Sequence, residues 1–135
     1  MTVGYKERVY SLPISCEVYR NLQTGSLSVR AKEGKHKGKV IDHISEVHLN
    51  DCEFHVNESG RQRVIENQRK NVHATVKGTL VDSKHKISNG INIIYNPYKF
   101  SEFVTEDTHS PVTTAEQVHI EVCNETVSFT AQNIS

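Results

Sequence analysis

The sequence lacks tryptophan, has a single methionine, and is only 36% apolar over its 135 residues. No stretch approaches the roughly 18 consecutive apolar residues that a transmembrane helix needs. The N-terminal segment MTVGYKERVYSL also lacks the apolar centre of a signal peptide. We therefore expect a soluble chain without a standard secretion signal, folded as one domain over residues 1–135. Its many valine and isoleucine residues favour a core built from strands.

Cysteine is scarce, and net charge is absent. The three cysteines, Cys16, Cys52 and Cys123, lie far apart and show no CxxC spacing. They predict free thiols in a reducing compartment and not a disulfide framework. Because 16 basic residues balance 16 acidic ones, the chain is unlike proteins that coat genomic DNA through a broadly basic surface. Zero net charge still allows a local basic pocket for a small anion.

Metal sites find little support in the sequence. His43, His48, Cys52 and His55 crowd one segment, but a zinc site needs three or four ligands that converge. A change in strand parity at residues 50–51 separates His48 from Cys52, so their convergence does not follow from their spacing. The sequence predicts no metal site and no cofactor.

Catalytic motifs are also missing. The chain has no glycine-rich Walker loop and no closely spaced pair of carboxylates on a regular element. The segment 73–75, His-Ala-Thr, resembles half of the paired His-x-Thr signature of two-histidine phosphoesterases, whose chemistry needs a second histidine. The nearest partner, His-Ile-Ser at residues 43–45, supplies serine in place of threonine. We therefore expect a protein that is not an enzyme.

Alternation of apolar and polar residues predicts an α+β fold made mainly of antiparallel sheet. Turn residues at 21–25 and 33–38 suggest that the N-terminal half is a meander of hairpins, and residues 124–125 suggest another hairpin. The parity change at 50–51 predicts a bulge, because a strand cannot change faces without an extra residue. The expected strands are 14–20, 27–31, 40–44, 46–49, 52–56, 72–81, 91–95, 118–123 and 126–131, with an irregular loop over 99–114.

One principal helix is expected over about residues 60–70. Ser59 and Gln62 have the spacing of a capping box, in which each side chain satisfies a free backbone amide of the first turn. Asn71 suits the left-handed residue that follows a helix. The predicted helix has few apolar residues beyond Val64 and Ile65, so we expect it to contact the sheet along a narrow stripe.

The segment RKNVHATVKG, residues 69–78, offers a row of polar groups at the start of a strand. On a strand, Val72, Ala74 and Val76 would face the core, and the residues between them would face away. Arg69, Lys70, Asn71, His73 and Thr75 are of the types that bind phosphate and read base edges. The alternative is a solvated strand face that follows a helix whose basic last turn suits its dipole.

Several stretches together resemble a family of small proteins encoded by bacteriophages. They are GRQRVI at 60–65, RKNVHA at 69–74, IYNPY at 94–98 with Phe103, the hairpin VYRNL at 18–22, and the loop 103–115. The pattern is similar to the Thoeris anti-defence proteins of the first type. Proteins of that type are sponges that bind cyclic nucleotide signals of bacterial immune systems and hold them without cleaving them.

This resemblance implies a homo-oligomer with pockets at subunit interfaces, acting in the cytoplasm of the infected bacterial host. The ligand would be a small anionic nucleotide of the cyclic ADP-ribose type or a cyclic oligonucleotide, as in Thoeris or CBASS immunity, with no membrane or genomic nucleic acid as partner. Together with the polar row, it implies ligand contacts at Arg61, Arg69, Lys70, Asn71, His73, Thr75, Tyr95 and Asn96. The alternative is a non-enzymatic structural or interaction module that binds protein through a sheet edge.

Overall fold

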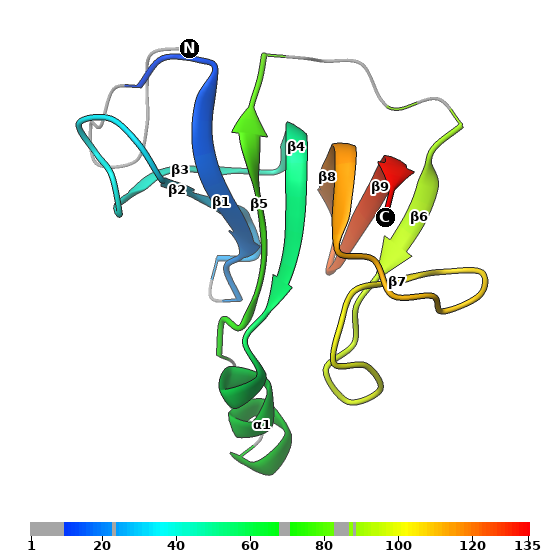
Figure 1. Ribbon diagram of the computed structural model, residues 1–135. Coiled ribbons are helices and arrows are strands. Elements are labelled where there is room, and N and C mark those ends of the chain that lie inside the picture. The colour runs from blue at the N-terminus through cyan, green and yellow to red at the C-terminus, as the bar shows by residue number, and fades with distance from the viewer. Residues whose placement is uncertain (1–9, 23, 68–70, 83–86, 88) are drawn as a thin grey trace.

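The computed structural model describes residues 10–22, 24–67, 71–82, 87 and 89–135, which form one nine-stranded antiparallel sheet and one helix (Figure 1). No helix among these residues is long and apolar enough to cross a membrane. The elements are β1 (Ile14–Arg20), β2 (Leu27–Ala31), β3 (Val40–Ile44), β4 (Glu46–Val56), α1 (Glu58–Asn67), β5 (Ala74–Leu80), β6 (Ile91–Ile94), β7 (Val104–Thr105), β8 (Thr114–Cys123) and β9 (Thr126–Ile134).

The strand order, β3-β2-β1-β5-β4-β8-β9-β6-β7, confirms only part of the predicted meander. Strands β1, β2 and β3 are joined as successive hairpins, as the turn residues predicted. Strand β4, however, lies between β5 and β8 and not beside β3. Three successive residues of β4, Val47, His48 and Leu49, are buried, so both faces of this strand are covered, which suits the middle of a sheet. In β3 only Ile41 is buried, and that strand lies at the edge.

Two local predictions about the sheet are confirmed. The pairing of β4 with β5 shifts register between Asn50 and Glu53, and Asp51 adopts a positive φ of 53°. This bulge lets Leu49 and Cys52 both lie in the core although their parity differs. The hairpin between β8 and β9 turns at residues 124–125, where Asn124 takes the left-handed conformation with φ 59°.

The helix begins earlier than the capping-box pattern predicted. Asn57, which follows β4 directly, accepts a hydrogen bond at its Oδ1 from the backbone N–H of Gly60 at 2.9 Å. Ser59, the predicted cap, lies inside the helix and donates its hydroxyl to the same Oδ1, and Gln62 bonds to Glu58. Asparagine caps a helix as well as serine does, so the spacing alone could not choose between them. The predicted end near residue 70 lies outside the described residues.

The sheet curls so that β1 and β5 face β9 and β6 across a common interior, with α1 beyond one end (Figure 1). Apolar side chains fill much of this interior, including Val18, Leu49, Val76, Val118 and Ile120. The curl turns one face of a single sheet toward this interior.

The cysteines give a first test of this packing. Burial raises the pKa of Cys16 and of Cys52 to about 12, whereas Cys123 is exposed at the β8–β9 turn. Because the thiolate is the reactive form, we expect a disulfide reagent at pH 8 to modify one thiol per native chain and all three after unfolding. The Cys123→Ser variant should lose the fast reaction. Rapid modification of Cys16 or Cys52 in the native protein would contradict the buried core.

Candidate functional site

A cavity of about 610 Å³ lies inside the curled sheet. Its size falls within the range of about 300–1,000 Å³ that is usual for small-molecule sites. Both halves of the sheet contribute to its wall, and most of the contributed side chains are apolar. They include Val18 of β1, Leu27 of β2, Val76 of β5, Ile94 of β6, Ile120 of β8 and Phe129 of β9.

Aromatic rings cluster around Phe103, and Tyr95, Phe103 and Phe129 of this cluster line the cavity. The centroid of the Phe103 ring lies 5.0 Å from that of Phe54, 5.1 Å from that of Tyr95 and 5.5 Å from that of Phe129. Ring pairs at these separations attract one another beyond simple burial of area. A wall of this kind suits a ligand that carries a flat ring, such as a nucleobase.

A histidine–tyrosine pair in the cavity wall joins the residue before β5 to the residue after β6. His73 Nδ1 lies 2.8 Å from the carbonyl oxygen of Asn71, and His73 Nε2 lies 2.7 Å from the hydroxyl of Tyr95. A carbonyl only accepts, so we assign the proton to Nδ1, and Nε2 then accepts from Tyr95. Burial raises the pKa of Tyr95 to about 12, which keeps this donor protonated. Both ring nitrogens of His73 are thus hydrogen-bonded, and the two contacts hold the ring in one orientation.

Arg20, the last residue of β1, supplies a cation to the cavity wall. Its Nη1 donates to the backbone oxygen of Glu125 in the β8–β9 turn at 2.7 Å. Its Nε is buried and has no hydrogen-bond partner among the described residues, and the same holds for the hydroxyl oxygen of Thr75, another lining residue. A buried polar group without a partner costs about 1–3 kcal/mol. A ligand with acceptor atoms would remove this cost at Arg20.

The structure brings four of the predicted ligand-binding residues to the cavity; two others make contacts outside its lining, and two lie outside the described residues. Asn71, His73, Thr75 and Tyr95 line the cavity. Arg61 donates from Nε to the backbone oxygen of Pro97 at 2.9 Å and forms an ion pair with Glu58. The side chain of Asn96 accepts a hydrogen bond from the backbone N–H of Tyr98 at 2.9 Å. Arg69 and Lys70 lie outside the described residues.

One part of the predicted strand pattern is wrong. Val72 was expected to face the core but is 46% exposed, and it lines the cavity together with Ala74 and Val76. Regular pairing of β5 begins only at Ala74, so strand alternation does not yet apply at residue 72. Residues that strand alternation had assigned to opposite faces, such as Ala74 and Thr75, therefore both line the cavity.

The lining residues that sequence analysis missed include Tyr19, Arg20, Leu22 and Tyr98. Three of these four lie in the VYRNL stretch, which had drawn attention only through family resemblance. Their place beside β5 depends on the register that sets Val18 opposite Val76. Nothing in the local sequence specifies that pairing.

The contact between α1 and His73 gives a prediction. A Cβ added at Gly60 would lie 2.8 Å from the Cβ of His73, closer than real Cβ atoms approach. Alanine normally stabilises a helix interior over glycine by about 1 kcal/mol, but here we expect Gly60→Ala to destabilise the protein. It should also displace His73 from Tyr95, which the nitrogen chemical shifts of the imidazole would report. Arg63→Ala, at an exposed position of the same helix, is the control; equal or greater stability of Gly60→Ala would contradict the close packing.

Comparison with known proteins identifies sequences to which this chain is similar. The family described as Mycobacterium phage L5 gene 82 protein matches residues 10–127. The "Gene 82 protein" of Mycobacterium phage L5 is 35% identical over 114 residues, which cover 80% of this chain and 90% of that protein. No solved structure matches. The matched range contains the lining residues of β1, β2, β5, β6 and β8 named above.

Proposed function

The chain belongs to the Mycobacterium phage L5 gene 82 protein family, and from this premise we propose that it captures a small nucleotide signal in the cavity. In this proposal the phage protein removes a cyclic nucleotide of host immunity from solution, in the cytoplasm of the infected cell, and holds it without cleaving it. The ligand class is the cyclic ADP-ribose type or a cyclic oligonucleotide, as the resemblance to Thoeris anti-defence sponges implied.

The observation that carries this proposal is the buried, unpartnered Nε of Arg20 in a cavity walled by aromatic rings. A nucleotide has phosphate oxygens for a guanidinium and a flat base for a ring wall. The site thus offers the two kinds of contact that this ligand class needs. Sequestration requires tight binding by contacts that are already formed before the ligand arrives, and it requires no proton transfer. The hydrogen bonds of His73 to Asn71 and Tyr95 hold part of the cavity wall in place in this way.

The charge balance supports the same ligand class. The chain carries equal numbers of acidic and basic residues, so its attraction for long nucleic acids is weak. One guanidinium at the wall of a partly open and largely apolar cavity acts locally, and the apolar lining strengthens its interaction with a bound anion. This arrangement favours a small anionic ligand over genomic nucleic acid.

A direct test is native mass spectrometry of the protein mixed with cyclic dinucleotides, cyclic trinucleotides and cyclic ADP-ribose-type compounds. We expect one class to remain bound and to be recovered unaltered after heating. A chemically changed product would identify an enzyme, and no binding or thermal shift with any of these compounds would overturn the proposal. The same spectra report the mass of the assembly and so test the predicted homo-oligomer.

The second candidate is an interaction module without a ligand. The sheet ends at β3 and β7, and Val104 of β7 also forms a bridge to Pro111. The edge at β3 is therefore the candidate, since an exposed edge can accept a strand from another protein. In that case changes in the cavity wall would leave function intact as long as the fold survives. The Arg20 variant treated in the Discussion separates the two candidates.

A further inference from the structure

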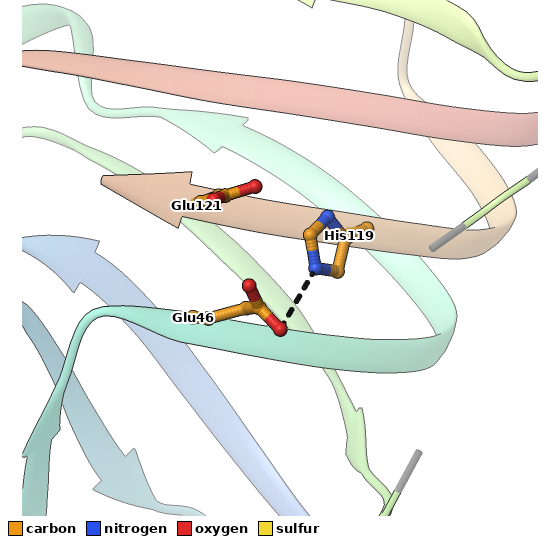
Figure 2. Close-up of side chains that lie close together, drawn as sticks. All are labelled: Glu46, His119 and Glu121. Carbon is orange, nitrogen blue, oxygen red and sulfur yellow. Dashed lines mark ion pairs between the residues drawn. The ribbon is translucent and has the colours of Figure 1, made fainter. Parts of the chain in front are cut away.

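A second group of polar side chains lies on β4 and β8, away from the cavity. Glu46 of β4 and His119 and Glu121 of β8 converge, with one ligand atom of each within 4.8 Å of the others (Figure 2). His119 and Glu121 flank Ile120, which lines the cavity. Because side chains alternate along a strand, the group occupies the opposite face of the sheet.

Pairing between the two strands sets this group in place. Glu46 is the direct cross-strand partner of Glu121, and His48 is the direct partner of His119. Two carboxylates and two imidazoles therefore form a two-by-two patch on one face. Like charges directly opposite each other destabilise a sheet, and a cation between the carboxylates would reverse that effect.

The spacing of the atoms suits a bound ion better than a hydrogen bond. His119 Nε2 lies 3.5 Å from Glu46 Oε1 (Figure 2), beyond the usual range of about 2.7–3.2 Å for an N–H···O bond. In a tetrahedral site with bonds of about 2.0–2.1 Å, two ligand atoms lie about 3.3 Å apart. The imidazole and the carboxylate are thus separated almost as two ligands of one ion would be.

A buried imidazole next to the group gives an independent indication. His48 is only 7% exposed, and its Nδ1 has no hydrogen-bond partner in the part of the chain that the structure describes. Its ring centroid lies 6.4 Å from that of His119. Buried polar atoms almost always find a partner, so an unpartnered nitrogen on a ring that neighbours His119 needs a reason. Binding of an ion in the patch would supply one.

We propose that Glu46, His119 and Glu121 bind a divalent transition-metal ion, with the His48 imidazole as a buried neighbour of the site. Imidazole and carboxylate ligands suit zinc and similar ions. The bound ion would tie β4 to β8 in the middle of the sheet, so its expected role is to stabilise the fold. This site differs from the His43, His48, Cys52 and His55 group considered from the sequence. Cys52 is in the core, Glu46 was not part of that group, and His119 and Glu121 come from β8.

The probe for this proposal is Zn²⁺ added to protein from which metal has been removed with EDTA. We expect calorimetry to show one ion bound per chain and thermal unfolding to move to a higher temperature. Loss of an outer-shell partner alone typically weakens metal binding 10- to 100-fold. Removing a direct ligand in Glu46→Gln or Glu121→Gln should therefore cost at least about 10-fold in affinity.

Two control variants make the test specific. His55→Gln changes an exposed histidine further along β4, and Cys123→Ser removes the exposed thiol that follows Glu121 on β8; both should bind zinc as the unaltered chain does. Cobalt substitution of the unaltered protein gives a readout that does not depend on the folding of any variant, because thiolate ligation produces an intense band and N/O ligation does not. Absence of stoichiometric zinc binding, undiminished binding in both glutamate variants, or a thiolate band with cobalt would each overturn the proposal.

Discussion

Replacing Phe103 by alanine is expected to lower the free energy of unfolding by about 3–5 kcal/mol, the usual cost of truncating a buried phenylalanine. Phe103 is 3% exposed, and its ring contacts those of Phe54, Tyr95 and Phe129. These neighbours belong to β4, to the segment after β6 and to β9. The single ring therefore joins the two halves of the curled sheet, and the strands around it cannot easily collapse into the space it leaves.

Denaturant unfolding followed by circular dichroism measures this effect. Tyr98→Ala is a suitable control because Tyr98 is an aromatic residue of the same connecting segment but is 62% exposed. A surface change of that kind usually alters stability by no more than about 0.5 kcal/mol. A loss below about 1 kcal/mol in Phe103→Ala would show that the ring cluster does not hold the two halves together.

The second large effect concerns ligand capture, and it rests on the proposed function. Arg20→Met keeps most of the apolar stem but removes the guanidinium from the cavity wall. Hydrogen bonds to charged groups contribute about 1.5–3 kcal/mol, so affinity for an anionic nucleotide should fall about 10- to 150-fold. Calorimetric titration of the nucleotide identified by native mass spectrometry measures the change directly.

Arg63→Met is the matched control for this experiment. Arg63 is exposed on α1, and it does not line the cavity. Its loss should leave nucleotide affinity unchanged. Equal affinities for Arg20→Met and the unaltered chain, with both folded, would remove the central support for the cavity as a nucleotide site. They would favour the interaction module instead.

Local features of the fold were predictable because alternation and turn chemistry act over a few residues. The bounds of β1, β2 and β3 agree with the predicted strands, and the bulge near Asp51 follows from a parity change that is visible in the sequence. The helix start was misplaced by a short distance because Asn57 and Ser59 are both good caps. Strand order was not predictable, since the insertion of β5 between β1 and β4 joins segments far apart in the chain.

In the candidate site, too, local features were predictable and long-range contacts were not. Four of the eight predicted residues were placed at the cavity, all within two short stretches of the chain, around residues 71–75 and at Tyr95. Arg20 was not predicted because its place in the site depends on the cavity, which no local sequence pattern indicates. The Glu46, His119 and Glu121 group escaped notice for a related reason, since two of its three members come from a strand distant in sequence.

The sequence by itself determined that this protein is mainly antiparallel sheet, where β1, β2 and β3 begin and end, and that its acidic and basic residues balance. It did not show β7, which lies within the predicted irregular loop. Tertiary structure alone decided which polar side chains meet. Alternation assigns a side chain to one face of its strand, but register and curl decide what lies opposite it. Register and curl depend on how apolar side chains are buried over the whole sheet. Together they placed Arg20 in the wall of a cavity and Glu46 beside His119.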